Sequence, residues 1–304
     1  MSIKAQPLDY LALVALSLMW SSSFLFIKIA VETVTPMSVA SGRMLIAAVA
    51  LYLFMKIRGM SLPRDKRSWI FFFIIGLIGN AIPFFLISWA ELTIDSSVAS
   101  ILIASAPLAA FMIGHVVTRD EKLTFVRFLG VITGFLGIIV LIGPESLFDL
   151  GVGALSQLAI VLGAICYVSA GFTARHMPDM DPSSRAAGVL IVASVIAVPI
   201  TLYLDKPWTL SPSTDSLLAL AMLGVFPTAI ATLILFFLIM RVGATFVSLN
   251  NYINPVLGVV WGYFFMAEHP VQQTYIGLAL ILGGLVVTQL KFNNLGKKLK
   301  SADT

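Results

Sequence analysis

The chain has 304 residues, of which 59% are hydrophobic and only 11% are charged, and its formal net charge is +4. Because a soluble domain carries about 25% charged residues, this composition excludes a soluble fold and predicts a protein that is solvated by lipid. A single cysteine, Cys166, and three scattered histidines exclude a disulfide framework and show no metal-ligand spacing, so we expect no metal and no cofactor.

Apolar runs of about 20 residues, the length that crosses a bilayer, occur ten times along the chain. The first run is too long, and too closely followed by others, to be a cleaved signal peptide. We therefore predict an all-α polytopic membrane protein with short loops. The ten predicted transmembrane helices span 9–30, 36–57, 68–91, 96–118, 122–142, 153–174, 184–204, 214–240, 243–266 and 272–291.

The basic residues predict the orientation of these helices. If the helices alternate in direction, all but Lys28, Arg43 and Lys206 of the 19 lysines and arginines fall on one face. Positive residues stay on the cytoplasmic side, so both termini are predicted to be cytoplasmic. Residues 293–304 then form a basic cytoplasmic tail that reports topology and contacts lipid, rather than a site for nucleic acid.

An internal repeat relates the two parts of the chain. A shift of 148 residues overlays Pro107 on Pro255, Ser100 on Ser248 and Asn80 on Thr228, and a shift of 147 overlays Trp20 on Tyr167 and Glu121 on Glu268. We predict two homologous five-helix repeats, a first half over 1–145 and a second half over 150–292. Because five is odd, the second half is inverted, and such inversion is typical of alternating-access transporters.

Two motifs carry a resemblance to a known family. "LMWSSSFLFIK" lies in the first predicted span and "LNNYINPVLGVVWGYFFMAE" in the ninth. With the ten spans and twinned halves, they resemble the EamA-type drug/metabolite transporters, and most of all the YddG-type exporters, whose substrates include aromatic amino acids. The resemblance implies a bacterial cytoplasmic (inner) membrane protein with a central cavity lined by both halves and with the fifth and tenth helices at the periphery.

Polar and aromatic residues near the middle of the spans are the candidate substrate-binding residues. Amides and hydroxyls in hydrocarbon are costly unless they are paired, so they face a cavity or join two helices. For Trp20 and Tyr167 the alternative to a cavity wall is ordinary packing. The predicted substrate-binding set is Trp20, Asn80, Phe84, Ser100, Tyr167, Ser248, Asn251 and Tyr252.

Pro107 and Pro255 lie near the middle of the fourth and ninth predicted spans. A proline there removes a backbone hydrogen bond and bends the helix, and the freed carbonyl is tolerated where it lines a hydrated cavity. We predict that both prolines are hinges, and the alternative is a static kink. If they are hinges, replacing each by alanine is expected to shift the access equilibrium in opposite senses.

Charges and glycines complete the pattern. Arg43 is the deepest charge, and it either snorkels, pairs with Glu91 or Asp95, or meets a substrate carboxylate. No acid occurs in residues 11–27, which argues against organic cations as substrates. Glycines in the fifth and tenth spans suit close helix packing within a monomer, with dimerisation through these helices as the alternative.

The predicted function is export of small neutral or zwitterionic metabolites, most plausibly amino acids including aromatic ones, by alternating access. Export of another apolar metabolite or a drug is the alternative within the same class. An intramembrane enzyme is disfavoured because the sequence shows no catalytic constellation, so we expect no catalytic residues. A receptor is disfavoured because it does not require an inverted repeat.

Overall fold

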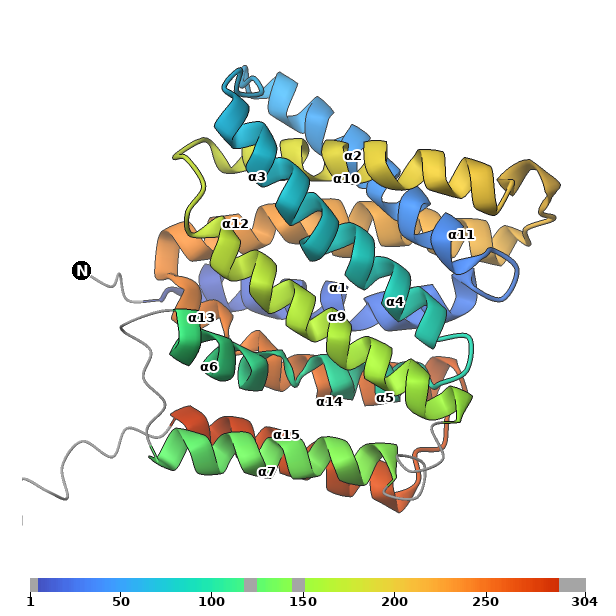
Figure 1. Ribbon diagram of the computed structural model, residues 1–304, viewed down its shortest axis with the longest axis vertical. Helices are drawn as coiled ribbons and strands as arrows, with labels where there is room; N and C mark the ends of the chain where they lie inside the picture. Colours follow the sequence, from blue (N-terminus) through green and yellow to red (C-terminus); the bar gives the residue numbers. More distant parts are fainter. Residues whose placement is uncertain (1–4, 118–124, 144–150, 290–304) are drawn as a thin grey trace, which may run out of the picture.

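The computed structural model describes residues 5–117, 125–143 and 151–289 (Figure 1), and their regular structure is helical. The helices are α1 (Pro7–Ala30), α2 (Pro36–Ile57), α3 (Lys66–Gly76), η1 (Leu77–Ala81), α4 (Ile82–Ala90), α5 (Ser96–Ile103), α6 (Ala106–Val117), α7 (Phe125–Ile142), α9 (Val152–Ala174), α10 (Pro182–Leu204), η2 (Pro207–Thr209), α11 (Thr214–Leu223), η3 (Gly224–Ile230), α12 (Ala231–Val242), α13 (Ala244–Val247), α14 (Asn250–Phe265) and α15 (Gln272–Gln289).

Within the described residues, eight helices are long and apolar enough to cross a membrane. They coincide with the first eight predicted spans to within a few residues, and three of them are built from consecutive segments: α3–η1–α4, α5–α6 and α11–η3–α12. The ninth and tenth predicted spans coincide with the shorter helices α14 and α15. The all-helical membrane class is therefore confirmed, and the count of ten spans stays a prediction.

Local chemistry explains where several helices begin. Pro7, Pro36 and Pro182 occupy the first position of α1, α2 and α10, where the missing N–H has no intrahelical partner and the fixed φ suits a helix. Asp65 caps α3, because its carboxylate accepts the Ser68 amide N–H at 2.8 Å. The Ser68 hydroxyl donates to the same carboxylate, and the two hydrogen bonds lower the pKa of Asp65 below its ordinary value.

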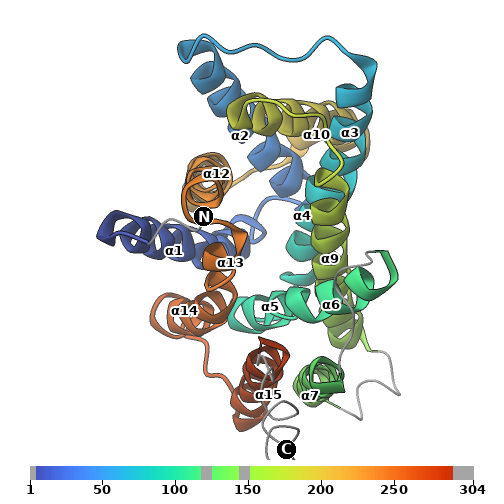
Figure 2. The same ribbon diagram turned by 90° about the vertical axis from the view of Figure 1, so that its left-hand side faces the viewer.

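The helices form one bundle, and Figure 2 views many of them nearly end-on. Helices α2, α3 and α10 gather at one edge of the bundle, and α7 and α15 lie together at the opposite edge. Between them, α1, α12 and α14 lie on one side and α4, α9 and the α5–α6 segment on the other. Helix α1 begins and α15 ends at the same end of the bundle (Figure 1).

The contacts between helices cross from one half to the other. Helix α7 packs along α15, α2 along α10, and α5 against α14. In addition, α1 packs against α11, α12 and α14, while α9 packs against α4, α5 and α6. The two halves therefore share one interior rather than forming two separate domains.

Two of the long helices contain a π-helical turn. In η1 the Ile82 amide bonds the Leu77 carbonyl five residues back, next to Pro83, which has no N–H to donate. In η3, Pro227 likewise has no N–H to donate to the Leu223 carbonyl four residues back. The two turns lie at corresponding places, because η1 shifted by 148 residues falls within η3.

Glycine backbones let α7 and α15 approach closely. A Cβ added at Gly130 would lie 2.6 Å from the Gly284 carbonyl oxygen, and one at Gly137 would lie 2.9 Å from the Gly277 carbonyl oxygen. Only glycine leaves space for backbones this close. These glycines bring two helices of the same chain together, and the preference for a monomer over a dimer stays a prediction.

Carboxylates of the second half cap two helices of the first half. Asp205 accepts hydrogen bonds from Thr35 and from the Ser38 amide and hydroxyl at the start of α2. Glu268 accepts the Ser96 amide at 2.7 Å and the Ser97 amide at 3.0 Å at the start of α5. Each carboxylate satisfies amides that lack an intrahelical partner. Both caps tie the halves together at the same end of the bundle.

Candidate functional site

Arg43, on α2, lies at the centre of a polar cluster inside the bundle. The residue is only 4% exposed. Its Nε donates to the Thr228 hydroxyl at 3.2 Å, and its Nη2 donates to the same hydroxyl at 3.0 Å and to the Ser23 hydroxyl at 3.4 Å. A buried charge without such partners would be very costly.

The π-helical turn η3 explains why Thr228 can serve this arginine. Pro227 frees the Leu223 carbonyl, and the Thr228 hydroxyl donates its one proton to that carbonyl at 2.7 Å. The hydroxyl oxygen then has only acceptor capacity left, and it is directed at the guanidinium. The proline, the threonine and the arginine therefore act as one unit that joins the two halves.

Two aromatic rings complete the cluster. The Arg43 guanidinium carbon lies 3.8 Å from the centroid of the Phe84 ring, a favourable cation–π arrangement. The Phe84 ring meets the Tyr167 ring edge-on, with centroids 6.4 Å apart. The cluster thus combines one cation, two hydroxyls and two aromatic faces, contributed by α1, α2, α4, α9 and η3.

Arg43 has no acidic counter-ion among the residues that the structure describes. The pairing with Glu91 or Asp95 that the sequence suggested is not formed within ion-pair distance; the ion pair seen in this part of the chain joins Arg241 and Asp9. Arg43 is therefore held directly by two hydroxyls and the Phe84 ring. A cation in this setting can take a ligand carboxylate without first displacing a bound acid.

The other predicted substrate-binding residues have different surroundings. The half-buried Asn80 amide donates to the Ile75 carbonyl of its own helix at 3.4 Å. Ser100 is buried, donates to the Ser97 carbonyl and packs against Gly258 of α14. The Tyr252 hydroxyl reaches the Leu285 carbonyl of α15 at 3.4 Å. The Asn80 and Ser100 hydrogen bonds stay within one helical segment. The Ser100–Gly258 and Tyr252–Leu285 contacts each join two helices.

Trp20 packs against a hydrophobic cluster that includes Ala231 and Val247. Ser248 and Asn251 are half-buried at the start of α14. Of the predicted set, the structure therefore brings together Phe84 and Tyr167. Sequence reasoning left Ser23 and Thr228 out of the set, although Thr228 overlays Asn80 in the repeat.

The two prolines also differ in their surroundings. The α5–α6 segment breaks at Ala104 and Ser105, so Pro107 lies in the first turn of α6, where its missing N–H costs little. Pro255 lies inside α14 and is buried. An interior proline removes one hydrogen bond of the helix, so the structure gives the larger backbone defect to Pro255.

We therefore expect Pro255→Ala to change access to the bundle interior, because the new amide can bond the Asn251 carbonyl and straighten α14. Pro107→Ala is the matched control and is expected to leave access close to wild type. The measurement is the rate of thiol-reagent labelling of single cysteines placed at the two ends of the bundle, with Cys166 replaced. Equal effects of the two substitutions, or none, would contradict a hinge at Pro255.

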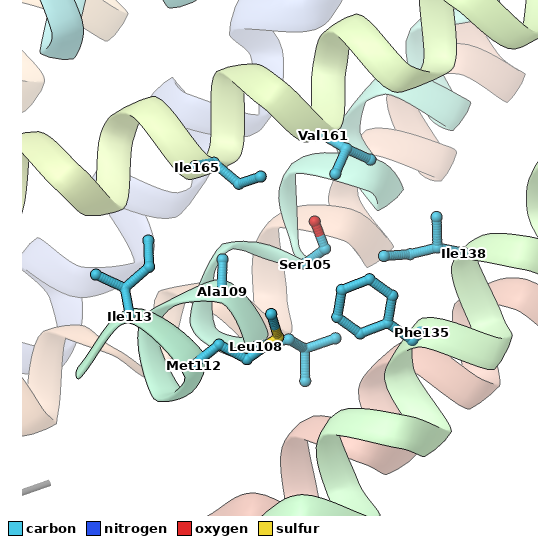
Figure 3. A pocket seen from close by; sticks show the side chains of 9 residues that line it. All are labelled: Ser105, Leu108, Ala109, Met112, Ile113, Phe135, Ile138, Val161 and Ile165. Carbon is cyan, nitrogen blue, oxygen red and sulfur yellow. The ribbon is translucent and has the colours of Figure 1, made fainter. Parts of the chain in front are cut away.

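A small apolar cavity lies apart from this cluster. It measures about 100 Å³ and is lined by α6, α7 and α9. Figure 3 shows aliphatic side chains and the Phe135 ring around it, with Ser105 as the polar contributor. A larger cavity of about 580 Å³ lies where α1 ends and α11 begins. It is lined by Glu32, Asp215 and Ala267 among others.

The eight long apolar helices of the described residues define a polytopic membrane protein. The chain belongs to the EamA-like transporter family, whose model matches it twice, over residues 8–143 and 154–290. The coarser functional prediction, a membrane transporter of the EamA superfamily, is thereby confirmed.

Relatives with known sequences and a solved structure agree with this assignment. The chain is 27% identical to "Uncharacterized transporter YdfC" of Bacillus subtilis (strain 168) over 288 residues, which cover 92% of this chain and 90% of the relative. It is 26% identical to "Uncharacterized inner membrane transporter YedA" of Escherichia coli (strain K12) over 281 residues, with 92% and 90% covered. A crystal structure with 20% identity covers 96% of this chain and 100% of its own, with a TM-score of 0.68, and shows the same fold.

Proposed function

We propose that the protein exports small neutral or zwitterionic metabolites, amino acids including aromatic ones, by alternating access. The observation that carries this proposal is the Arg43 cluster. A guanidinium binds a carboxylate through charge-assisted hydrogen bonds, and the Phe84 and Tyr167 rings offer apolar faces to a side chain. One cation beside two rings therefore matches an amino acid better than it matches an organic cation.

The contact pattern supports two inverted halves. Exchanging each helix of the first half for its counterpart in the second maps the α1–α14 contact onto α9 with α5 and α6, and the α4–α9 contact onto α12 with α1. The α2–α10, α5–α14 and α7–α15 contacts map onto themselves. A pseudo-two-fold axis produces this behaviour. The two separate family matches support the same division.

The local irregularities support it as well. In η1 the Asn80 side chain donates to the Ile75 carbonyl, and in η3 the Thr228 side chain donates to the Leu223 carbonyl. Both bonds run five residues back, and both residue pairs are related by the shift of 148. We propose that these paired bends lie at similar depth in the membrane and let each half change shape.

We further propose ten spans with both termini on the cytoplasmic side of the bacterial inner membrane. The basic residues favour this orientation, and α1 begins where α15 ends (Figure 1). The caps by Asp205 and Glu268 then lie at the outer end of the bundle. The basic tail over 293–304 is outside the described residues. We also propose a monomer, because the glycines of α7 and α15 already pack against each other within one chain.

Counterflow in proteoliposomes tests this function. Vesicles that hold the purified protein and unlabelled phenylalanine are expected to take up labelled phenylalanine transiently. Each unlabelled molecule that leaves the vesicle returns the binding site to the outside, where it can bind a labelled molecule. Competition by other amino acids, by neutral apolar metabolites and by organic cations then ranks the substrate classes. A lack of counterflow with every amino acid, alongside movement of another class, would overturn the amino-acid assignment.

A further inference from the structure

Glu91 is a fully buried carboxylate that the Arg43 cluster does not use. It follows the last residue of α4 and has no exposed surface. Neither of its carboxylate oxygens has a hydrogen-bond partner in the described part of the chain. A charged carboxylate in this position is strongly disfavoured, whereas a protonated one is tolerated far better. The geometry therefore fits the neutral acid in the state that the structure shows.

Three charged groups act on Glu91, each from a different segment, and a fourth, Asp95, lies four residues away in the sequence. The Lys28 ammonium of α1 donates to the Glu91 and Ile94 backbone carbonyls, at 2.8 Å each, instead of to the carboxylate. Arg43 of α2 and Glu268, between α14 and α15, also act electrostatically on Glu91. Asp95, at the start of α5, is exposed. Partial desolvation of its carboxyl group, together with the Glu268 charge, raises the pKa of Asp95.

Glu268 connects Glu91 to the contact between the halves. Its carboxylate is held by the Ser96 and Ser97 amides at the start of α5, so it carries a negative charge that the helix end stabilises. Ala267, the residue before it, adopts a left-handed backbone with φ of 51° and turns the chain toward α5. The cavity of about 580 Å³ reaches Ala267, next to this contact.

We propose that Glu91 is a proton-binding site whose charge controls the outer contact between Glu268 and α5 and couples proton movement to transport. This inference rests on the proposed export function. When Glu91 is neutral, Glu268 stays on α5 and the outer end is closed, as in the structure. When Glu91 loses its proton, two carboxylates repel each other in a poorly solvated region, and the outer end opens.

Because the deprotonated protein opens outward and the protonated protein closes, substrate and protons are exchanged across the membrane in opposite directions. In the open outer state, water reaches Glu91, and its carboxylate takes up one proton from outside to become a carboxylic acid. The outer end then closes, and the proton leaves to the cytoplasm after the inner end opens. The deprotonated protein with bound substrate favours the open outer state and releases its cargo outside. Each cycle therefore moves one proton inward for each substrate exported.

The test compares wild type with Glu91→Gln, which mimics the neutral acid, and with the matched control Asp95→Asn, four residues away. Proteoliposomes prepared at acidic pH are diluted into alkaline buffer that contains labelled phenylalanine. Uptake by wild type and by Asp95→Asn is expected to rise several-fold over uptake without the gradient, and a protonophore is expected to abolish the rise. Glu91→Gln is expected to show no rise, and its counterflow at equal pH is expected to fall well below wild type, because a neutral residue at this position keeps the outer end closed.

Infrared difference spectra between acidic and alkaline samples give a readout that needs no substrate. A protonated-carboxyl band is expected in wild type and in Asp95→Asn and is expected to be missing in Glu91→Gln. If Glu91→Gln keeps its response to the gradient, or if wild type shows counterflow but no response, the coupling is overturned. If wild type shows no counterflow, the proposed function fails, and the infrared band alone then supports or overturns the proton site.

Discussion

Replacing Arg43 by leucine is expected to reduce phenylalanine counterflow by roughly 100-fold, because removing one partner of a buried, hydrogen-bonded charge pair costs 2–5 kcal/mol. Leucine cannot bind the substrate carboxylate, and Thr228 and Ser23 lose the group to which they are hydrogen-bonded. The measurement is the initial counterflow rate at equal pH on both sides, normalised to the amount of inserted protein.

Arg43→Lys is the matched control. Lysine keeps the charge but loses the planar fork that holds two hydroxyls and stacks on Phe84, so an intermediate rate is expected. A second readout separates recognition from folding: wild type is expected to prefer phenylalanine over phenylalanine amide as a competitor, and Arg43→Leu is expected to lose this preference. Retained preference in a well-inserted Arg43→Leu protein would show that the substrate carboxylate binds elsewhere.

Replacing Gly284 by alanine is expected to destabilise the protein strongly. The new Cβ would lie 2.5 Å from the Gly130 carbonyl oxygen and 2.6 Å from the Gly134 amide nitrogen. Both neighbours are backbone atoms, so α7 and α15 must move apart, and overpacking of this kind costs about 1–3 kcal/mol. The measurement is the apparent unfolding temperature in detergent, followed by intrinsic fluorescence or by a thiol-reactive dye.

The neighbouring glycine provides the control. A Cβ added at Gly283 meets no atom within 4 Å, so Gly283→Ala is expected to keep the wild-type unfolding temperature or to raise it slightly through lower backbone entropy in the unfolded chain. The two substitutions are chemically identical and lie one residue apart. If Gly284→Ala and Gly283→Ala unfold at the same temperature, close backbone packing of α15 on α7 is not a source of stability.

The helical class was predictable from the sequence because the thickness of a bilayer fixes the length of an apolar run. The predicted span 68–91, for example, matches the continuous segment α3–η1–α4 over Lys66–Ala90. The π-helical turn inside it was not predictable, since Pro83 signals a disturbance but not how the hydrogen bonds rearrange around it.

The candidate site was only partly predictable. Phe84 and Tyr167 were chosen for their depth, and the structure brings them together. The partner of Arg43, however, is Thr228, 185 residues away, and periodicity gives no information on contacts at that separation. Periodicity places Tyr252 on one face of its helix but does not reveal that this face meets α15. Which helix meets which face depends on tertiary packing.

The close pair of α7 and α15 has a mechanical consequence. Each half ends in one of these helices, and their backbones approach closely at the glycines. Such a joint resists sliding, because any shift drives a Cα or a side chain into the opposite backbone. In the proposed alternating-access cycle, we therefore expect this pair to keep its place at one edge of the bundle (Figure 2) while the other helices move. The largest displacement is then expected at the opposite edge, where α2, α3 and α10 gather.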